Sequence, residues 1–331
     1  MQNEMVRAAE RVWGPAGSVR GVILTEGYAG LEAQALGLAE RAGIVAQTRT
    51  LTASRPWSWI SATLWPAPLA AVGGLGDLPD GLVLTAGGTG GAVGAALRRR
   101  GRRVVQIQNP RTRLDRFDLV VVNRHDEIDG PNVLTARTAL HRVTPAVLAE
   151  ARRVWTARLA HLPRPLVAVL VGGSNGRFRL GPAEAEALAG TLAGMMRADR
   201  VGLALTPSRR TGDAVRAVLE RRLSPEGAWV WDMRGENPYL GLLACADAIV
   251  VTSDSVSMIS EAAATGVPVM VARLPGQSRR IGLFLDELTG ADRIRIFNGR
   301  LEDWGVTPLD DTGAVAEELC RRLGLPGPSD A

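Results

Sequence analysis

Short polar side chains that can bind an anion are concentrated in residues 248–272, AIVVTSDSVSMISEAAATGVPVMVA. Ser253, Asp254 and Ser255 follow an apolar run there, and each has an oxygen that can accept a hydrogen bond from a free backbone N–H at the start of a helix. Such a helix start offers further free N–H groups and the positive end of the helix dipole, which attract phosphate. The pattern therefore predicts a site for a phosphorylated ligand.

Two buried strands and a short helix are expected to position these side chains. Residues 248–252 and 267–271 are apolar runs, typical of strands that are buried on both faces. The helix between them has an apolar face and an opposite face that carries Ser257 and Glu261, and Gly266 is a natural place for it to end. The segment is thus expected to fold as strand, loop, helix and strand.

Glu261 lies about one turn into this helix. Its spacing is wrong for a capping box with Asp254 or Ser255, which requires the acid three residues after the cap. Two interpretations stay open: a solvated helix carboxylate, or an acceptor that binds a ligand.

Polar and glycine-rich segments also follow two strands predicted earlier in the second half of the chain. Residues 166–171 lead into the turn 172–177, GGSNGR, where small residues let backbone N–H groups converge on an anion. Residues 201–205 lead into 206–211, TPSRRT. Both segments follow the carboxyl ends of strands, where open α/β sheets bind ligands.

The first half of the chain shows the same alternation of strand and helix. Residues 21–25 are a predicted strand, followed by a turn and by a helix that carries Glu32, but no GxGxxG motif is present. His125 and Asp126 follow a predicted strand at 119–122, and His125 is the histidine best placed for chemistry. Alternatively, Glu32 is an ordinary helix-surface residue and His125 a structural or solvated loop residue.

Residues 56–68, PWSWISATLWPAP, concentrate tryptophan in a chain with few aromatic residues. Trp57, Trp59 and Trp65 at this density suit a membrane interface, where the ring is buried and the N–H stays hydrated. The alternative is that these rings pack against the first domain.

Composition places the chain among ordinary globular α/β proteins with two domains. It has 331 residues, 46% hydrophobic and 22% charged, and no apolar run of the roughly 18–20 residues that span a membrane. We place the linker at Pro163-Arg164-Pro165, which predicts domains at 1–162 and 163–331. No leader sequence opens the chain, and Cys245 and Cys320 lack metal-ligand spacing, so we expect a cytoplasmic protein without a metal site.

The net charge of +5 comes from arginine, since the chain contains no lysine. Guanidinium groups suit phosphate and carboxylate ligands. No basic stripe is interleaved with aromatic residues, so nucleic acid is not an expected partner, while an anionic ligand or membrane surface is compatible. The oligomeric state is left open.

Six blocks, in this order, resemble one family, the bacterial homologues of the plant mitochondrial-fission "elongated mitochondria" proteins. The blocks are residues 34–42, 108–111, 122–126, 171–178, 206–211 and 251–268. Within the last block, residues 260–268, SEAAATGVP, are similar to the donor-binding segment of two-domain nucleotide-sugar glycosyltransferases. In those enzymes the Glu of a Ser-Glu pair binds the ribose hydroxyls, and Glu261 stands in that place.

The resemblance implies an α/β fold with two facing Rossmann-like (GT-B-like) domains and a cleft between them. The C-terminal domain would bind a nucleotide-diphosphate sugar as donor, without a resident cofactor. The N-terminal domain would face the acceptor, and the last helix could pack back on it. The residues then expected to bind the nucleotide sugar are Gly172, Gly173, Ser174, Asn175, Arg177, Ser208, Arg209, Arg210, Thr211, Asn237, Tyr239, Ser253, Asp254, Ser255, Ser257, Ser260 and Glu261.

Three functions stay open. The first is a glycosyltransferase that acts on a lipid-linked or membrane-surface acceptor at the inner membrane face, with Glu32 or Asp126 as base. The glycosyltransferases usually carry a catalytic histidine in the first loop, and this chain has none there. The second is a nucleoside-diphosphate-sugar epimerase that uses His125, Asp126 and Glu32. The third is a non-catalytic, membrane-associated interaction protein.

Overall fold

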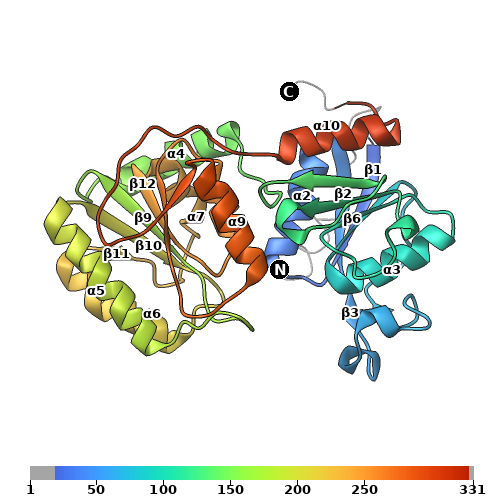
Figure 1. Ribbon diagram of the computed structural model, residues 1–331, viewed down its shortest axis with the longest axis horizontal. Helices are drawn as coiled ribbons and strands as arrows, with labels where there is room; N and C mark the ends of the chain where they lie inside the picture. Colours follow the sequence, from blue (N-terminus) through green and yellow to red (C-terminus); the bar gives the residue numbers. More distant parts are fainter. Residues whose placement is uncertain (1–18, 328–331) are drawn as a thin grey trace. The chain divides into compact units, whose positions relative to one another are not determined.

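The computed structural model describes residues 19–327, which form two compact units. Unit 1 contains the described residues through Val122, Ile128–Thr135, and those from Thr312 onward. Unit 2 contains Asn123–Glu127 and Ala136–Asp311. Each unit has its own six-stranded sheet (Figure 1). Within residues 19–327 no helix has the length and apolar character needed to cross a membrane.

Unit 1 is built on a sheet with the strand order β2-β1-β5-β6-β7-β8. Its strands are apolar runs, and residues such as Val22, Ile23 and Leu24 are completely buried, as expected for strands covered on both faces. Its elements are β1 (Val19–Thr25), α2 (Ala29–Arg41), β2 (Ile44–Thr50), β3 (Thr52–Ala53), η1 (Trp57–Trp59), η2 (Ala62–Leu64), β4 (Val72–Gly73), β5 (Leu82–Ala86), α3 (Gly87–Arg99), β6 (Val104–Ile107), η3 (Leu114–Arg116), β7 (Leu119–Asn123), β8 (Val133–Ala136) and α10 (Thr312–Leu323).

Unit 2 has the strand order β11-β10-β9-β12-β13-β14, and all of its strand pairs are parallel. Numbered within the unit, this is the doubly wound order 3-2-1-4-5-6. Its elements are η4 (Arg124–Asp126), α4 (Pro145–Leu159), β9 (Leu166–Val171), α5 (Pro182–Asp199), β10 (Gly202–Pro207), α6 (Asp213–Leu223), η5 (Ser224–Glu226), β11 (Trp229–Val230), α7 (Tyr239–Cys245), β12 (Ala248–Thr252), α8 (Val256–Ala263), β13 (Val269–Ala272), α9 (Arg279–Gly290) and β14 (Ile294–Ile296).

Alternate residues of β9 supply two separate hydrophobic cores in unit 2. Val167, Val169 and Val171 belong to the core that includes residues of α5 and α6. Leu166, Ala168 and Leu170 belong to the core that includes residues of α4, α7 and α9. Since neighbouring side chains of a strand point to opposite faces, the sheet is covered by helices on both sides.

Most of the predicted elements are confirmed, and the structure adds strands that the sequence analysis missed. The bounds of β9 and β12 match the predicted strands. The missed strands include β2 and β8. The sequence of β2, IVAQTRT, is largely polar because this strand lies at the edge of its sheet and is only partly buried or exposed beyond its first residue.

The compact units also differ from the boundary expected at residues 162/163. Helix α4 belongs to unit 2, because Trp155, Leu159 and Leu162 lie in the same core as residues of α7. At the other end of the chain, α10 packs against α2 in unit 1, where Cys320 Sγ lies 3.7 Å from the Ala42 carbonyl oxygen. The linker Pro163-Arg164-Pro165 therefore lies within unit 2.

A buried arginine fixes the carboxyl end of α8, the helix that carries Glu261. Arg293 is 3% exposed, and its guanidinium donates to the carbonyl oxygens of Ala263 (2.8 Å), Ala262 (3.2 Å) and Thr265 (2.7 Å). Burial lowers the pKa of Arg293 to about 10. The cation both satisfies the free carbonyl groups and complements the negative end of the helix dipole.

Replacing Arg293 with Met should lower the free energy of unfolding by about 2–4 kcal/mol, because several buried carbonyl oxygens lose a charged donor. Urea unfolding of the full chain measures the change. Arg221→Met is the matched control, because Arg221 is an exposed arginine paired with Glu186 on the surface, where the loss should stay below about 1 kcal/mol. Equal losses for the two variants would show that Arg293 does not hold α8.

Candidate functional site

Three loops meet at the carboxyl edge of the unit 2 sheet. They follow β9 (residues 172–177), β10 (208–212) and β12 (253–255). Strands β9 and β12 are neighbours although two strands separate them in the sequence, so the strand order reverses at this point. Open α/β sheets bind their ligands at such a switch point.

The carboxylate of Asp254 joins these loops to one another. It is fully buried and accepts hydrogen bonds from Thr252 Oγ1 (2.7 Å) and from the backbone N–H of Gly173 (3.0 Å). Arg210 Nη2 forms an ion pair with it at 2.8 Å. Because these partners satisfy the buried charge, we assign Asp254 a positioning role and not direct contact with a ligand.

The same contacts explain why glycine is required at two positions of the turn. A Cβ atom on Gly172 would lie 2.2 Å from Asp254 Oδ2, and one on Gly173 would lie 2.2 Å from the carbonyl oxygen of Arg210. The N–H of Gly172 already donates to Thr252 Oγ1 (2.8 Å), as that of Gly173 does to Asp254. Both N–H groups therefore hold the loops together and are not free for a phosphate.

The remaining residues of the first two loops form internal turns that leave arginine side chains exposed. Asn175 Oδ1 accepts from the backbone N–H of Arg177 (2.9 Å), and Thr211 Oγ1 accepts from that of Ser208 (2.9 Å). Ser174 Oγ pairs with the backbone of Leu180. Exposed side chains of Arg177, Arg209 and Arg210 remain, and the two loops contain no acidic residue. They are suited to neutralise an anion.

The serine residues around α8 differ in what they can still bind. Ser253 Oγ accepts from the N–H of Leu274 (3.0 Å), and Ser260 Oγ accepts from that of Ala139 (2.9 Å), so both buried hydroxyls act within the fold. Ser255 caps the helix by accepting from Met258 N (3.4 Å). Ser257, in the first turn, is partly exposed.

Glu261 is partly buried and paired with a tyrosine. The Tyr239 hydroxyl donates to Glu261 Oε2, and Asn237 Oδ1 accepts from the Tyr239 N–H at 3.0 Å, which fixes the start of α7. Burial raises the pKa of Glu261 to about 7, although the Tyr239 hydrogen bond lowers it in part. Burial and the neighbouring carboxylate raise the pKa of Tyr239. Glu261 is therefore not a freely solvated helix carboxylate.

The structure places His125 and Asp126 in η4, packed against α9. The His125 ring is 3% exposed and lies edge-on to Phe284 at 5.3 Å, and burial lowers its pKa to about 4. Asp126 forms an ion pair with Arg280 and accepts from the N–H of Asn123 (3.1 Å). The imidazole packs against α9 and the carboxylate caps η4, and their catalytic role stays a prediction without a geometric argument in its favour.

Unit 1 has a switch point of its own, between β1 and β5. Glu26 follows β1, and its Oε1 accepts from the N–H of Thr89 (3.2 Å) in the first turn of α3. The protein's own carboxylate therefore occupies a helix start, and this contact was missed from the sequence. The available sequence signal is the glycine-rich run at 87–91, which allows other groups to approach the backbone closely. Glu32 lies in the first turn of α2 and is partly exposed, so it stays the predicted base.

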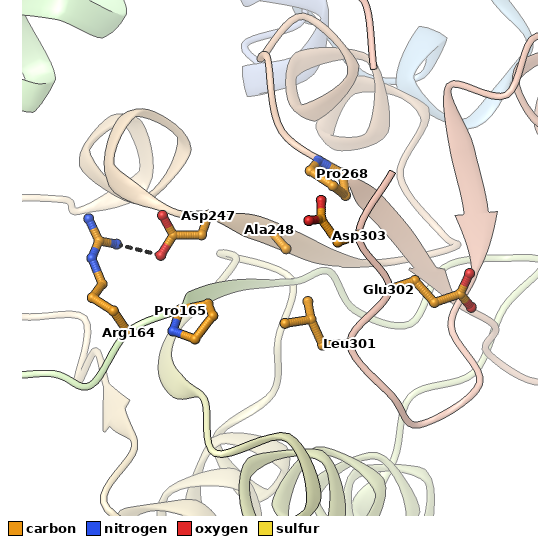
Figure 2. A pocket seen from close by; sticks show the side chains of 8 residues that line it. All are labelled: Arg164, Pro165, Asp247, Ala248, Pro268, Leu301, Glu302 and Asp303. Carbon is orange, nitrogen blue, oxygen red and sulfur yellow. Dashed lines mark ion pairs between the residues drawn. The ribbon is translucent and has the colours of Figure 1, made fainter. Parts of the chain in front are cut away.

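A cavity of about 480 Å³ lies at the opposite edge of the unit 2 sheet (Figure 2). It is lined by Pro165 and Ala248, which lie where β9 and β12 begin. Figure 2 shows the ion pair of Arg164 and Asp247 on its wall. The two side chains lie 3.0 Å apart, and Asp247 also accepts from Leu166 N (2.6 Å). The cavity is remote from the loops at the carboxyl edge. No cluster of metal-ligating side chains is found among residues 19–327.

Solved structures with this fold define its class. A UDP-GlcNAc 2-epimerase from Methanocaldococcus jannaschii matches 92% of this chain and 99% of its own, with a TM-score of 0.55 and 12% identity. A UDP-glucosyltransferase from Polygonum tinctorium matches 94% and 90%, with a TM-score of 0.52 and 14% identity. At these identities the likeness shows the fold, which is the predicted GT-B-type α/β class.

Within that class, the chain belongs to the mitochondrial fission ELM1 family, as predicted, because a profile of this family matches residues 29–323. The mitochondrial fission protein ELM1 of Arabidopsis thaliana is 34% identical in an alignment over 251 residues that covers 68% of this chain and 58% of the plant protein. An uncharacterised protein of Rickettsia prowazekii is 26% identical in an alignment over 282 residues that covers 72% of this chain and 79% of its own.

Asp254→Asn should lower the free energy of unfolding by about 2–3 kcal/mol, because the ion pair with Arg210 is lost and one amide group cannot accept from all three donors. Asp213→Asn is the matched control, because Asp213 is 91% exposed and pairs with Arg216 on the surface. Urea unfolding measures both. A loss no larger than that of Asp213→Asn would mean that the loops are held together by other contacts.

The raised pKa of Glu261 predicts a pH dependence of stability. Because the folded-state pKa lies above the value of about 4.5 in the unfolded chain, ionisation costs the folded state free energy as the pH rises from about 5 through 7. Relative to Glu261→Gln, the wild type should therefore lose stability between pH 5 and pH 8, on the order of 1–2 kcal/mol. Unfolding at both pH values measures it. Parallel pH profiles of the wild type and Glu261→Gln would contradict burial of Glu261.

Proposed function

We propose that unit 2 binds a nucleotide-diphosphate sugar and that the protein is a transferase that uses it as donor. The observation that carries the proposal is the partly buried pair of Glu261 and Tyr239 on helices of the unit whose sheet edge presents three arginines. A UDP-GlcNAc 2-epimerase of the same fold, from Neisseria meningitidis, has been solved bound to UDP-GlcNAc, with a TM-score of 0.51 and 14% identity.

In this proposal Glu261 accepts hydrogen bonds from the ribose hydroxyls. The Tyr239 hydroxyl already donates to one carboxylate oxygen, which orients the carboxylate and leaves the second oxygen for the ligand. A charged acceptor in a partly buried site forms stronger hydrogen bonds than a solvated one. Because burial raises the pKa of Glu261 to about 7, the carboxyl group is partly protonated near neutral pH in the unliganded protein. Hydrogen bonds donated by the ribose hydroxyls would stabilise its ionised form.

The diphosphate would contact the exposed arginines and the start of α8. Arg177 and Arg209 have exposed guanidinium groups, and Ser257 lies in the first turn of the helix, where N–H groups are free. Positive groups that are already in place stabilise the charge that develops on a leaving diphosphate. Glu32 stays the candidate that removes the proton of the acceptor.

An epimerase on the same scaffold is the second candidate, because two of the solved structures with this fold are UDP-GlcNAc 2-epimerases. Epimerisation by deprotonation removes a proton from a carbon of the sugar, and a proton from the solvent can replace it. Deuterium from the solvent would therefore enter a bound nucleotide sugar without any acceptor. Mass spectrometry detects this exchange. Transfer alone leaves the donor unlabelled.

Glu261→Ala should weaken the binding of a nucleoside diphosphate by about ten- to a hundredfold, since each lost charged hydrogen bond contributes about 1.5–3 kcal/mol. Glu261→Gln should lose less, because the amide oxygen still accepts. Calorimetry on the full chain with UDP, GDP, dTDP and CDP, alongside thermal melts, measures both, and Glu220→Ala on the exposed face of α6 is the matched control.

The pH profile separates Glu261 from other causes. Wild-type affinity should rise between about pH 6 and pH 8 as Glu261 ionises, whereas Glu261→Gln should keep only the titration of the ligand. Absence of binding to all four nucleotides would end the proposal. Unchanged affinity of a folded Glu261→Ala variant would leave nucleotide binding intact but show that another residue binds the ribose.

A further inference from the structure

An excursion from the sheet of unit 1 carries its most exposed apolar side chains. Between β2 and β5 the chain leaves the sheet through the two-stranded antiparallel stem of β3 and β4, which encloses the turns η1 and η2. Figure 1 shows this segment extending away from the sheet of unit 1. Ser54 closes the stem, because its N–H and its hydroxyl both donate to the Ala71 carbonyl oxygen, at 2.9 and 3.0 Å.

One tryptophan holds this excursion in shape. Trp65 is 7% exposed, and its indole N–H is shared between the carbonyl oxygens of Trp57 and Ile60, both at 3.1 Å. Trp57 is partly buried against the core of unit 1. Of the three tryptophans expected at a membrane interface, Trp57 and Trp65 therefore pack within unit 1, and only Trp59 faces the solvent.

The tip of the excursion, residues 55–65, exposes large apolar side chains to the solvent. Trp59 is 75% exposed, Leu64 70% and Ile60 41%, and they make up three of the five exposed large hydrophobic residues among residues 19–327. Large apolar side chains gathered on one projecting segment mark an interaction surface, whereas single exposed ones are ordinary.

The excursion itself carries charge of one sign only. Residues 51–76 contain no acidic residue, and their single charged side chain is Arg55, whose guanidinium lies 5.5 Å from the centre of the Trp59 ring. Arg99 of α3 and Arg116 of η3 line a hollow of about 50 Å³ together with Ala62 and Thr63 of the excursion. None of these three arginines pairs with a carboxylate in the part of the chain that the structure describes.

We propose that residues 55–65 form a docking tip for an anionic lipid bilayer. Trp59, Ile60 and Leu64 enter the interfacial region of the bilayer, and Arg55, Arg99 and Arg116 contact lipid phosphates. Indole rings prefer this region, and apolar insertion combined with a basic patch gives the two signals that stable peripheral attachment requires. The unpaired arginines favour a lipid surface over an apolar protein partner. This inference is independent of the proposed function, because it concerns unit 1 alone.

Sedimentation of the full-length protein with vesicles tests the tip. Vesicles of phosphatidylcholine with about one third phosphatidylglycerol should pellet the wild type, and pure phosphatidylcholine should pellet at least about fivefold less. Trp59→Ser combined with Leu64→Ser should reduce binding to the anionic vesicles by about tenfold or more, as expected when two apolar anchors are lost. Leu240→Ser, which removes an exposed leucine of unit 2, is the matched control and should bind like the wild type.

Two further variants separate insertion from simple charge attraction. Arg99→Gln with Arg116→Gln should weaken binding to anionic vesicles, whereas the exposed pair Arg221→Gln with Arg222→Gln should not. The Trp59→Phe variant should still pellet with anionic vesicles. Quenching of its tryptophan fluorescence by brominated lipid should be weaker than that of the wild type. Circular dichroism checks that each variant is folded.

Several results would overturn the proposal. They are failure of the wild type to bind anionic vesicles, equal pelleting of the wild type and the Trp59→Ser/Leu64→Ser variant, and quenching that is unchanged in Trp59→Phe. Self-association of the wild type that the same double variant abolishes, without vesicle binding, would assign the tip to a contact between proteins.

Discussion

The buried charge of Asp254 is the constraint on which the arrangement of the candidate site depends. A carboxylate without solvent must be fully paired, and here the partners are Gly173 and Arg210 of the two neighbouring loops and Thr252 at the end of β12. Two glycines follow from this arrangement, since a side chain at Gly172 would collide with the Asp254 carboxylate and one at Gly173 with the backbone of Arg210. Arg210 balances the buried charge and still keeps 43% of its side chain exposed. Because the Arg210 charge is balanced by Asp254, the positive charge at the surface of the site comes from the exposed side chains of Arg177 and Arg209.

Helix α8 is fixed at both ends, by a hydrogen-bond acceptor at its start and by a hydrogen-bond donor at its end. Ser255 accepts from the N–H of Met258 at the start, and Arg293 donates to the carbonyl groups at the end. The arginine complements only the negative end of the dipole, so the positive end is still available to an anion. Because the helix is fixed at both ends, Glu261 is presented to Tyr239 in a defined position.

The sequence predicted much of the fold but less of the site. Buried parallel strands such as β9 and β12 are readable because their residues are continuously apolar, whereas the polar edge strand β2 has no such signal. The residues at the strand ends were found, but one chain does not reveal which way a side chain points. Asp254 and His125 could therefore be found as polar residues near strand ends, while their burial depends on contacts with distant segments.

The division of the chain has a consequence for the order in which the protein is made. Unit 1 combines the first described residues with α10 (Thr312–Leu323), which packs against α2, whereas residues 136–311 of unit 2 are continuous. During synthesis a domain can fold only once its residues have left the ribosome. Unit 2 therefore has nearly all of its chain available before unit 1 receives its last helix. The amino-terminal unit, translated first, is the one completed last.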